Sequence, residues 1–208
     1  MIKTLIVKSN FFLSSDFVKK YDAHEVFIEK IMEIKLLNVK IPSNYRKIII
    51  TSPYAMSETL AKLSIDTEFF VVGKRAERAL QEAGFTKITR YKNIGKLEKN
   101  IDKNWDYLYL RGNIVKKVPN IEKILEITCY EAIYNDDLSF DAKILIKSGF
   151  LERVFLFSAM IAEKFIEMII ASGLKGYMES TVFYIMSEDS IELCVKNGLK
   201  YEIIDYDY

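Results

Sequence analysis

Short apolar runs alternate with amphipathic segments along the chain, and this alternation predicts strands that are each followed by a helix. Runs of β-branched and aromatic residues bounded by polar turns are typical of strands buried in a parallel sheet. Strands are expected at residues 4–7, 23–37, 47–51, 68–72, 87–91, 106–110, 125–134, 154–157, 181–186 and 200–204. Helices are expected at residues 55–63, 74–83, 94–101, 114–125, 142–149, 159–171 and 188–197, with Pro119 setting the first turn of its helix. The sequence therefore predicts an α/β protein with parallel sheets covered by helices on both faces.

One strand, turn and helix pattern occurs twice. KIIITSPYAMSETL is followed by FFVVGKRAERALQEAGF in the first half, and VFLFSAMIAEKFIEMI is followed by TVFYIMSEDSIELCVKNGL in the second. Ser52 and Ser158 occupy matching places, as do Gly84 and Gly198, and the second copy carries a modest insertion. A duplicated module of this kind predicts two similar α/β lobes with a ligand in the crevice between them. We therefore expect the site at the turns that follow the strands.

Composition narrows the class of protein. The 208 residues are 50% apolar and 28% charged, which is ordinary for a soluble globular protein with one large or two small domains. The net charge is +1 and the basic residues are scattered, so nucleic acid is not expected as a partner. No run has the length of a signal-peptide core or of a membrane span, and Cys129 and Cys194 form no CxxC motif. We therefore expect a cytoplasmic protein without disulfides or a cysteine-bound metal.

Polar residues at two matched strand ends are the first candidate binding residues. Thr51 and Ser52 close one apolar strand, and Ser158 and Ala159 follow its counterpart in the second half. A serine just before a helix caps it with its hydroxyl, and the first free N–H groups of that helix favour a carboxylate or a phosphate. Capping alone would explain one isolated serine, but two copies in matched places favour ligand binding.

Glycine and charged residues at three other turns extend this candidate site. Gly73 allows the backbone to pass close to a ligand, and Lys74 beside it adds positive charge. The matching turn of the second half, Ser187 to Asp189, is acidic instead, so only one lobe is suited to anions at this point. Arg111 and Gly112 follow another strand, an arrangement that is more often a solvated turn. No phosphate-loop or dinucleotide-binding glycine motif is present.

The scarcity of histidine limits the catalytic chemistry. His24 is the only histidine, which argues against a histidine-dependent triad or a multi-histidine metal site. Asp136 and Asp137 are adjacent acids in an expected loop, where such a pair is usually just solvated. A tyrosine, lysine or carboxyl group would then supply a proton. Tyr130 stands out because its strand is expected to join the two lobes.

The sequence resembles the uroporphyrinogen-III synthase family over nearly its whole length. The matching stretches occur in the family's order and are IITSPYAMSETL, FFVVGKRAERALQEAGF, YLRGN, ITCYEAIY, FLFSAMIAEKF and YIMSEDSIELCVKNGL. Each motif alone is weakly specific, but their ordered sum is much stronger. The resemblance implies two flavodoxin-like lobes with parallel sheets, joined by a two-stranded β ladder, with a cleft between the lobes. It implies one discontinuous lobe of residues 1–33 plus 135–208, a second lobe of residues 35–128, and connecting strands near 26–36 and 126–134.

The resemblance also implies an activity. The family converts linear hydroxymethylbilane, a tetrapyrrole with eight carboxylates, to uroporphyrinogen III with loss of water and inversion of the terminal pyrrole ring, a step of haem biosynthesis. It uses no cofactor and no metal, and a cytoplasmic monomer acting on this small-molecule substrate is expected, without nucleic acid or membrane as a partner. The family's tyrosine in the linking strand corresponds to Tyr130, which is expected either to donate a proton or only to hydrogen-bond a carboxylate. Substrate-binding positions are then expected at Lys8, Thr51, Ser52, Gly73, Lys74, Arg111, Gly112, Ser158, Ala159 and Ser187.

The chain departs from the family's pattern at three places. The first strand ends in Lys8 where the family usually has an arginine, and lysine lacks the bidentate grip on a carboxylate. The second glycine-rich turn is replaced by Ser187, Glu188 and Asp189, and no final helix is expected between the last strand and Tyr208. A weakened or divergent enzyme stays open, as do two other classes of function: a non-catalytic two-lobe binder of an anionic small molecule, and a flavodoxin-like regulatory or interaction module.

Overall fold

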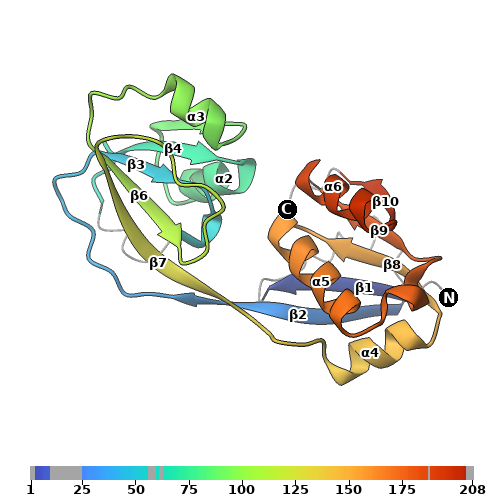
Figure 1. Cartoon of the computed structure of the whole chain (residues 1–208). Helices are drawn as coiled ribbons and strands as arrows, with labels where there is room; N and C mark the ends of the chain where they lie inside the picture. Colours follow the sequence, from blue (N-terminus) through green and yellow to red (C-terminus); the bar gives the residue numbers. More distant parts are fainter. Residues whose placement is uncertain (1–2, 10–24, 56–59, 61–62, 187, 205–208) are drawn as a thin grey trace. The chain divides into compact units, whose positions relative to one another are not determined.

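The computed structural model describes residues 3–9, 25–55, 60, 63–186 and 188–204 of the chain (Figure 1). The chain divides into two compact units. We call them the terminal unit, which is Met1–Glu33 with Ile133–Tyr208, and the central unit, which is Ile34–Ala132.

The central unit is a parallel sheet in which short helices connect most successive strands. Its strands lie in the order β7-β6-β3-β4-β5 and are β3 (Lys47–Ile50), β4 (Glu68–Val72), β5 (Ile88–Tyr91), β6 (Tyr107–Gly112) and β7 (Ile124–Tyr134). Each described pair of neighbours in this order runs parallel. The 3₁₀ turn η1 (Pro53–Ala55) follows β3, and the helices α2 (Lys74–Glu82) and α3 (Ile94–Asn100) follow β4 and β5.

Alternate residues of these strands fill two separate cores. Ile48 and Ile50 pack in one core with Leu80 of α2, whereas Ile49 packs in another with Leu97 of α3. Because successive side chains of a strand point to opposite faces, α2 and α3 cover opposite faces of this sheet. The continuous apolar run of β3 is thus buried on both sides, as expected of a strand in a parallel sheet.

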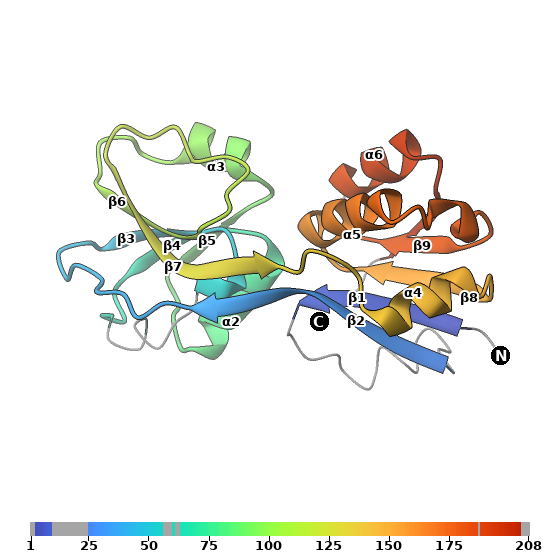
Figure 2. The same cartoon turned by 60° about the horizontal axis from the view of Figure 1, so that its bottom comes forward.

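The terminal unit contains a second parallel sheet. Its strands lie in the order β10-β9-β8-β1-β2 and are β1 (Lys3–Ser9), β2 (Glu25–Leu36), β8 (Leu151–Leu156), β9 (Val182–Ile185) and β10 (Lys200–Ile203). Its helices are α4 (Phe140–Lys147), α5 (Ala159–Ala171) and α6 (Glu188–Lys196), with the 3₁₀ turn η3 (Lys175–Met178). Helices α5 and α6 pack against each other on one side of the strands (Figure 2).

The two units share one strand order. Counted along the chain, the central unit has the order 3-2-1-4-5, and the terminal unit has the same order when β8, β9, β10, β1 and β2 are counted in turn. This makes β1 and β2 the counterparts of β6 and β7, and the register shifts at the same place in both pairs, between Lys8 and Ser9 and between Arg111 and Gly112. The duplication indicated by the sequence therefore extends to the strand order in circularly permuted form. Flavodoxin has the order 2-1-3-4-5, and the terminal unit has this same order when β1, β2, β8, β9 and β10 are counted as they follow along the chain.

Strands β2 and β7 are neighbours in the sheet, and each runs from one unit into the other. In the central unit the N–H of Leu37 donates to the carbonyl of Cys129 at 2.9 Å. In the terminal unit the N–H of Asn135 donates to the carbonyl of Ile31 at 3.0 Å. The strand expected at residues 23–37 is therefore confirmed as β2, and these bonds hold it at Ile31 in its middle and at Leu37 just beyond its end.

The helix expected at residues 114–125 is wrong. Residues 113–123 are irregular, and β7 begins at Ile124. Pro119 removes a backbone donor, and a residue before proline, here Val118, is disfavoured in the helical region. Burial falls on Pro119 and Ile121, a spacing of two rather than of a helical turn, and the N–H of Ile121 donates to the carbonyl of Pro119 at 3.0 Å.

The helix expected at residues 55–63 is described only in part. The structure has the 3₁₀ turn Pro53–Ala55 there, and residues 56–59 and 61–62 lie outside the described ranges. The other expected strands and helices are confirmed with small shifts of their ends, and Gly84 after α2 has the expected left-handed φ of 90°.

Candidate active site

Tyr130 lies in β7 of the central unit with only 8% of its surface exposed. Its ring lies against the backbone of Gly112 in the neighbouring strand β6, where an added Cβ atom would meet ring atoms Cε2 and Cζ at 2.6 Å. The ring of Tyr54 packs edge-on against Tyr130, with centroids 5.7 Å apart and an interplanar angle of 64°. The position of the tyrosine therefore depends on a glycine at residue 112.

The Tyr130 hydroxyl is hydrogen-bonded to the side chain of Ser52, which follows β3. Burial raises the pKa of Tyr130, and the bond with Ser52 opposes part of this shift. The phenol is therefore neutral at physiological pH and keeps its proton available for donation.

The turn after β3 uses its polar groups within the central unit. The hydroxyls of Thr51 and Tyr109 are 2.9 Å apart, and the Ser52 hydroxyl accepts from the N–H of Tyr54 at 3.3 Å. The N–H of Ala55 donates to the carbonyl of Ser52 at 3.1 Å, and Pro53 has no N–H. This turn therefore offers a ligand its hydroxyl groups, and the free N–H groups expected here are not found at residues 53–55.

Arg111 lies near the end of β6, and its positive charge is balanced by Glu126. Its Nε donates to Oε2 of Glu126 at 2.6 Å, and its Nη1 donates to the carbonyl of Gly112 at 2.8 Å. A guanidinium held in two directions fixes the backbone next to Gly112. Arg111 thus supports the strand end that Tyr130 packs against.

Asn113 lies one residue beyond the end of β6 and is hydrogen-bonded to β7, the strand that carries Tyr130. Its N–H donates to the carbonyl of Tyr130 at 3.1 Å, and its side chain accepts from the N–H of Ala132 at 2.8 Å. Its amide nitrogen donates back to the carbonyl of Ala132 at 3.3 Å. The Asn113 side chain therefore bonds the N–H and the carbonyl of Ala132, as a neighbouring strand would. It holds the backbone of β7 two residues beyond Tyr130.

Gly73 begins the turn between β4 and α2 in a conformation that suits glycine. Its φ of 91° and ψ of 148° are disfavoured for other residues, and it occupies the N-cap of α2 without a side chain to cap it. Lys74, the first residue of α2, is exposed. The start of α2 therefore presents backbone donors and a nearby positive charge.

The terminal unit carries the other expected binding positions. Ser158 is the N-cap of α5, with its hydroxyl accepting from the N–H of Ile161 at 3.3 Å, so the expected capping role is confirmed. Ala159 is the first residue of α5, and Lys8, which is partly buried, is the last residue but one of β1. Ser187 lies outside the described residues.

The structure thus brings the expected residues together in two sets, one in each unit. The carboxyl ends of parallel strands share one edge of a sheet, which is the usual binding edge of α/β proteins. The central set is Thr51, Ser52, Gly73, Lys74, Arg111, Gly112 and Tyr130. The terminal set is Lys8, Ser158 and Ala159.

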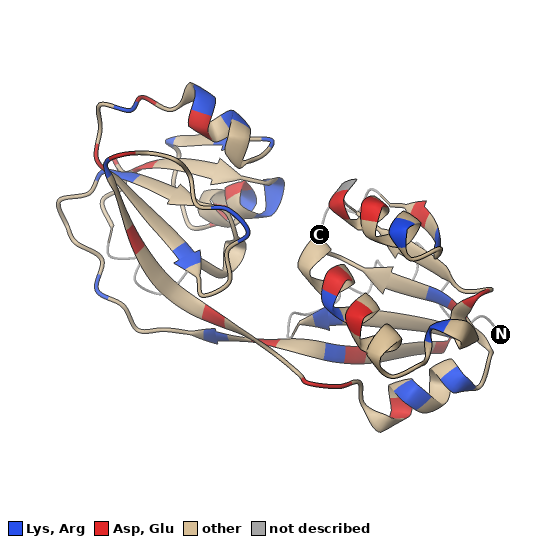
Figure 3. Ribbon diagram, in the orientation of Figure 1, with Lys and Arg blue, Asp and Glu red and all other residues tan. Residues whose placement is uncertain are grey.

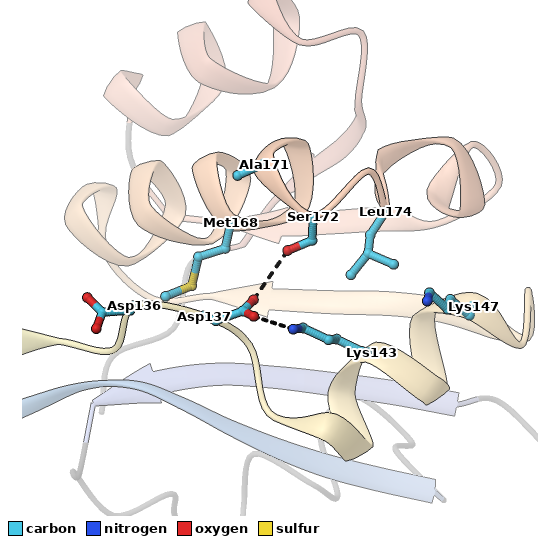
Figure 4. Close-up of a pocket in the computed structure, with 8 residues that line it drawn as sticks. All are labelled: Asp136, Asp137, Lys143, Lys147, Met168, Ala171, Ser172 and Leu174. Atoms are coloured by element: carbon cyan, nitrogen blue, oxygen red, sulfur yellow. Dashed lines mark hydrogen bonds and ion pairs between the residues drawn. The ribbon is translucent and has the colours of Figure 1, made fainter.

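A pocket of about 420 Å³ lies elsewhere in the terminal unit, between α4 and the end of α5 (Figure 4). Asp137 in its wall bonds Lys143 and accepts from the hydroxyl of Ser172 at 3.3 Å. The bond from Lys143 holds the pKa of Asp137 below its ordinary value. The pocket contains none of the expected site residues, and its polar wall is occupied by these internal bonds.

Metal-binding groups of side chains and membrane-spanning helices are both absent from the part of the chain that the structure describes. Histidine, cysteine, aspartate and glutamate side chains form no group of three that could hold a metal there. No helix in the same ranges has both the length and the apolar character needed to cross a bilayer.

The family model described as Uroporphyrinogen-III synthase HemD matches residues 27–204, which contain the whole Tyr130 site. The chain belongs to the uroporphyrinogen-III synthase family. It is a hydro-lyase of tetrapyrrole and haem biosynthesis, and its reaction forms uroporphyrinogen III from a linear tetrapyrrole. The resemblance seen in the sequence motifs is thereby confirmed.

Two solved uroporphyrinogen III synthases share the fold of this family member. A mutant enzyme from the extremely thermophilic bacterium Thermus thermophilus has a TM-score of 0.65 at 11% identity, covering 99% of this chain and 94% of that chain. The enzyme from Helicobacter pylori has a TM-score of 0.62 at 14% identity, covering 98% of this chain and 92% of that chain. These likenesses confirm a mixed α/β fold built on a mostly parallel sheet of 10 strands. No curated protein sequence matches the chain.

The synthase site contains residues that the sequence did not single out. Asn113, Tyr54 and Tyr109 all contact the expected residues within the central unit. A signal for Asn113 was present in the sequence, since RGN at residues 111–113 matches KSN at residues 8–10 in the duplicated pattern. Tyr54 and Tyr109 stand within the matching stretches IITSPYAMSETL and YLRGN, but neither of them was assigned a role from the sequence.

Proposed function

We propose that Tyr130 is the proton donor of this uroporphyrinogen-III synthase. The observation that carries the proposal is a buried, neutral phenol held by Ser52 and pressed against Gly112 at the carboxyl edge of a parallel sheet. A general acid has to be fixed in place and protonated at the working pH, and both conditions are met here.

The proton is needed when the hydroxyl group of the linear tetrapyrrole leaves. Protonation turns that group into water, and the remaining azafulvene is attacked by the substituted carbon of the terminal ring, which gives a spiro intermediate. The older bond from this carbon to the neighbouring ring's bridge then breaks, and the released bridge carbon bonds to the free α-carbon of the terminal ring, so that the ring is inverted. A phenol is a far stronger acid than water even when its pKa is raised, so it still transfers its proton favourably to departing hydroxide. The bond from Ser52 stabilises the phenolate that forms, and the terminal ring later releases a proton as it regains aromaticity.

We propose further that the substrate carboxylates bind at the strand ends of both units. In the central unit the binding residues are Thr51, Ser52, Gly73, Lys74, Arg111 and Gly112, and in the terminal unit they are Lys8, Ser158, Ala159 and Ser187. The first turn of α5 supports this, because its first N–H groups have no acceptor within the helix and favour an anion. Arg111, balanced by Glu126, contributes mainly by holding Gly112.

Two lobes with a cleft between them complete the proposal. The lobes are residues 1–33 plus 135–208 and residues 35–128, with connecting strands near 26–36 and 126–134, and the enzyme is a cytoplasmic monomer. The division of the chain after Glu33 and after Ala132 supports these boundaries, and the shared strand order supports lobes of one kind. Holding the flexible chain in one shape would favour the inverted closure over direct closure.

The test supplies linear hydroxymethylbilane from the preceding enzyme and measures the ratio of isomers formed. The unaltered enzyme is expected to shift the product from the I isomer to the III isomer, and product that stays the I isomer would contradict the function. Tyr130→Phe keeps the ring against Gly112 but removes the proton, so kcat is expected to fall by about 10² to 10⁴ with little change in KM. The exposed Tyr177 supplies a control, since Tyr177→Phe should leave kcat unchanged. A raised KM with an unchanged kcat for Tyr130→Phe would make Tyr130 a carboxylate ligand and not the donor.

A further inference from the structure

Two lysines lie side by side near the carboxyl end of β1 in the terminal unit. Lys8 and Lys30 are register partners on the parallel strands β1 and β2, where basic segments are drawn in blue in Figure 3. Residues in register on neighbouring strands point to the same face of a sheet. Burial, and after it the charge of Lys30, lowers the pKa of Lys8, so the two ammonium groups repel each other. Like charges placed opposite each other destabilise a sheet.

The other end of the same two strands is balanced. Lys3 and Glu25 are also register partners, and their Nζ and Oε2 atoms are 4.0 Å apart. No ion pair among the described residues involves Lys8 or Lys30. The strand pair therefore carries a matched charge pair at its amino end and a repelling pair at its carboxyl end.

The duplicated fold supplies a second comparison. Arg111 is the counterpart of Lys8, because each stands just before the register shift of its strand. In the central unit the charge of Arg111 is balanced by Glu126 at 2.6 Å. The same position thus carries a balanced charge in one unit and an excess of positive charge in the other.

The neighbouring strand adds a second feature that favours an anion. Val7 of β1 is in register with Leu156 of β8, and Ser158 caps α5 two residues further on. The first N–H groups of this 13-residue helix therefore lie at the same sheet edge as Lys8. A helix start and two lysines at one edge both attract negative charge.

We infer that Lys30 and Lys8 together form a carboxylate-binding site that anchors the acidic tetrapyrrole on the terminal unit. The inference rests on the proposed function and adds Lys30, which no motif indicated. A bound carboxylate lies between two positive charges and relieves their repulsion. The free protein accordingly keeps an unfavourable charge pair that its substrate neutralises.

The experiment compares Lys30→Glu, Lys30→Gln and the control Lys3→Gln in the full chain. The probe is uroporphyrin III, the oxidised macrocycle with the same eight carboxylates, and its Kd is measured by fluorescence at low and high salt. Thermal unfolding of the free protein and the KM and kcat of ring closure are measured in parallel. We expect Lys30→Glu to raise Tm, because Lys8 gains an opposite charge, and to raise Kd about tenfold with a weaker salt dependence. KM should rise with kcat unchanged, and Lys30→Gln should shift each value in the same direction by less.

The control separates this site from general charge effects. Lys3→Gln removes a lysine from the balanced end of the same strand, so Tm should fall slightly and Kd should stay the same. An unchanged Kd in both Lys30 variants, or a lower Tm for Lys30→Glu, would overturn the inference. If either result is found while the unaltered enzyme forms the III isomer, only the lysine site is contradicted. If the unaltered enzyme does not form that isomer, the proposed function is contradicted.

Discussion

Replacing Gly112 with alanine is the sharpest perturbation of the Tyr130 site. The added Cβ would lie 2.6 Å from two ring carbons of Tyr130 and 2.9 Å from its hydroxyl oxygen. Tyr130 is buried and has Tyr54 packed edge-on against it, so its ring cannot simply swing into solvent. The methyl group therefore displaces the tyrosine or the strand that carries it.

The size of the displacement sets the expected effect. An ordinary carbon–carbon contact is about 3.5 to 4.0 Å, so the ring has to move by roughly 1 Å. Overpacking of this kind costs about 1–3 kcal/mol of unfolding free energy, and weakening the bond to Ser52 adds about 1 kcal/mol. A displacement of ~1 Å of a reacting group costs about 10² in rate. Gly112→Ala should therefore fold but lose most of its activity.

The assay measures the rate and isomer ratio of ring closure together with urea unfolding. Gly95→Ala is the matched control, because Gly95 lies in α3 and its added Cβ would meet only Asn93 Oδ1, at an ordinary 3.5 Å. This control should unfold at equal or higher urea concentration and keep full activity. In a Tyr130→Ala background the stability cost of Gly112→Ala should vanish, since the clashing ring is gone. Wild-type stability and a kcat within twofold of wild type for Gly112→Ala would refute the reasoning.

Two further predictions follow from buried groups of the central and terminal units. Asn113→Ala leaves the N–H and carbonyl of the buried Ala132 without their side-chain partners. Urea unfolding should therefore show a loss of about 1–3 kcal/mol in unfolding free energy, and kcat should fall with it. Unchanged stability would show that water replaces the amide. Burial raises the pKa of the Cys129 and Cys194 thiols to about 11, so their thiolate fraction at pH 8 lies below that of a free cysteine and rises only as the pH approaches that value. Mass spectrometry should find neither thiol alkylated by iodoacetamide at pH 8 in the native protein and both alkylated in urea, and rapid native labelling would contradict their burial.

The strands and most helices were predictable because burial follows their local patterns. The apolar run of β3 and the helix start at Ser158 each place their signal within a few neighbouring residues. The helix expected at residues 114–125 was wrong because the apolar residues of this segment suit a helix, while Pro119 and the bonds of Lys117 and Asn120 to Glu98 favour an irregular path. Local propensity is a weak prior when tertiary contacts oppose it.

The candidate site was predictable in its residue types but not in its contacts. Ser52, Gly112 and Tyr130 were expected as separate binding or catalytic positions on different strands. The approach of the Tyr130 ring to Gly112 depends on the register shift between β6 and β7, which no local pattern encodes. The role of Asn113 depends on the same shift, since only there does its side chain reach Ala132.

The sequence by itself determined the alternation of strands and helices, the duplicated turns and the family, because each of these is written in short stretches of residue pattern. The tertiary structure alone decided which strands are neighbours, and with that the Tyr130 packing on Gly112 and the side-by-side placement of Lys8 and Lys30. The physical reason is register: a shift of one residue between strands changes which side chains share a face, and that register is fixed by packing across the whole sheet.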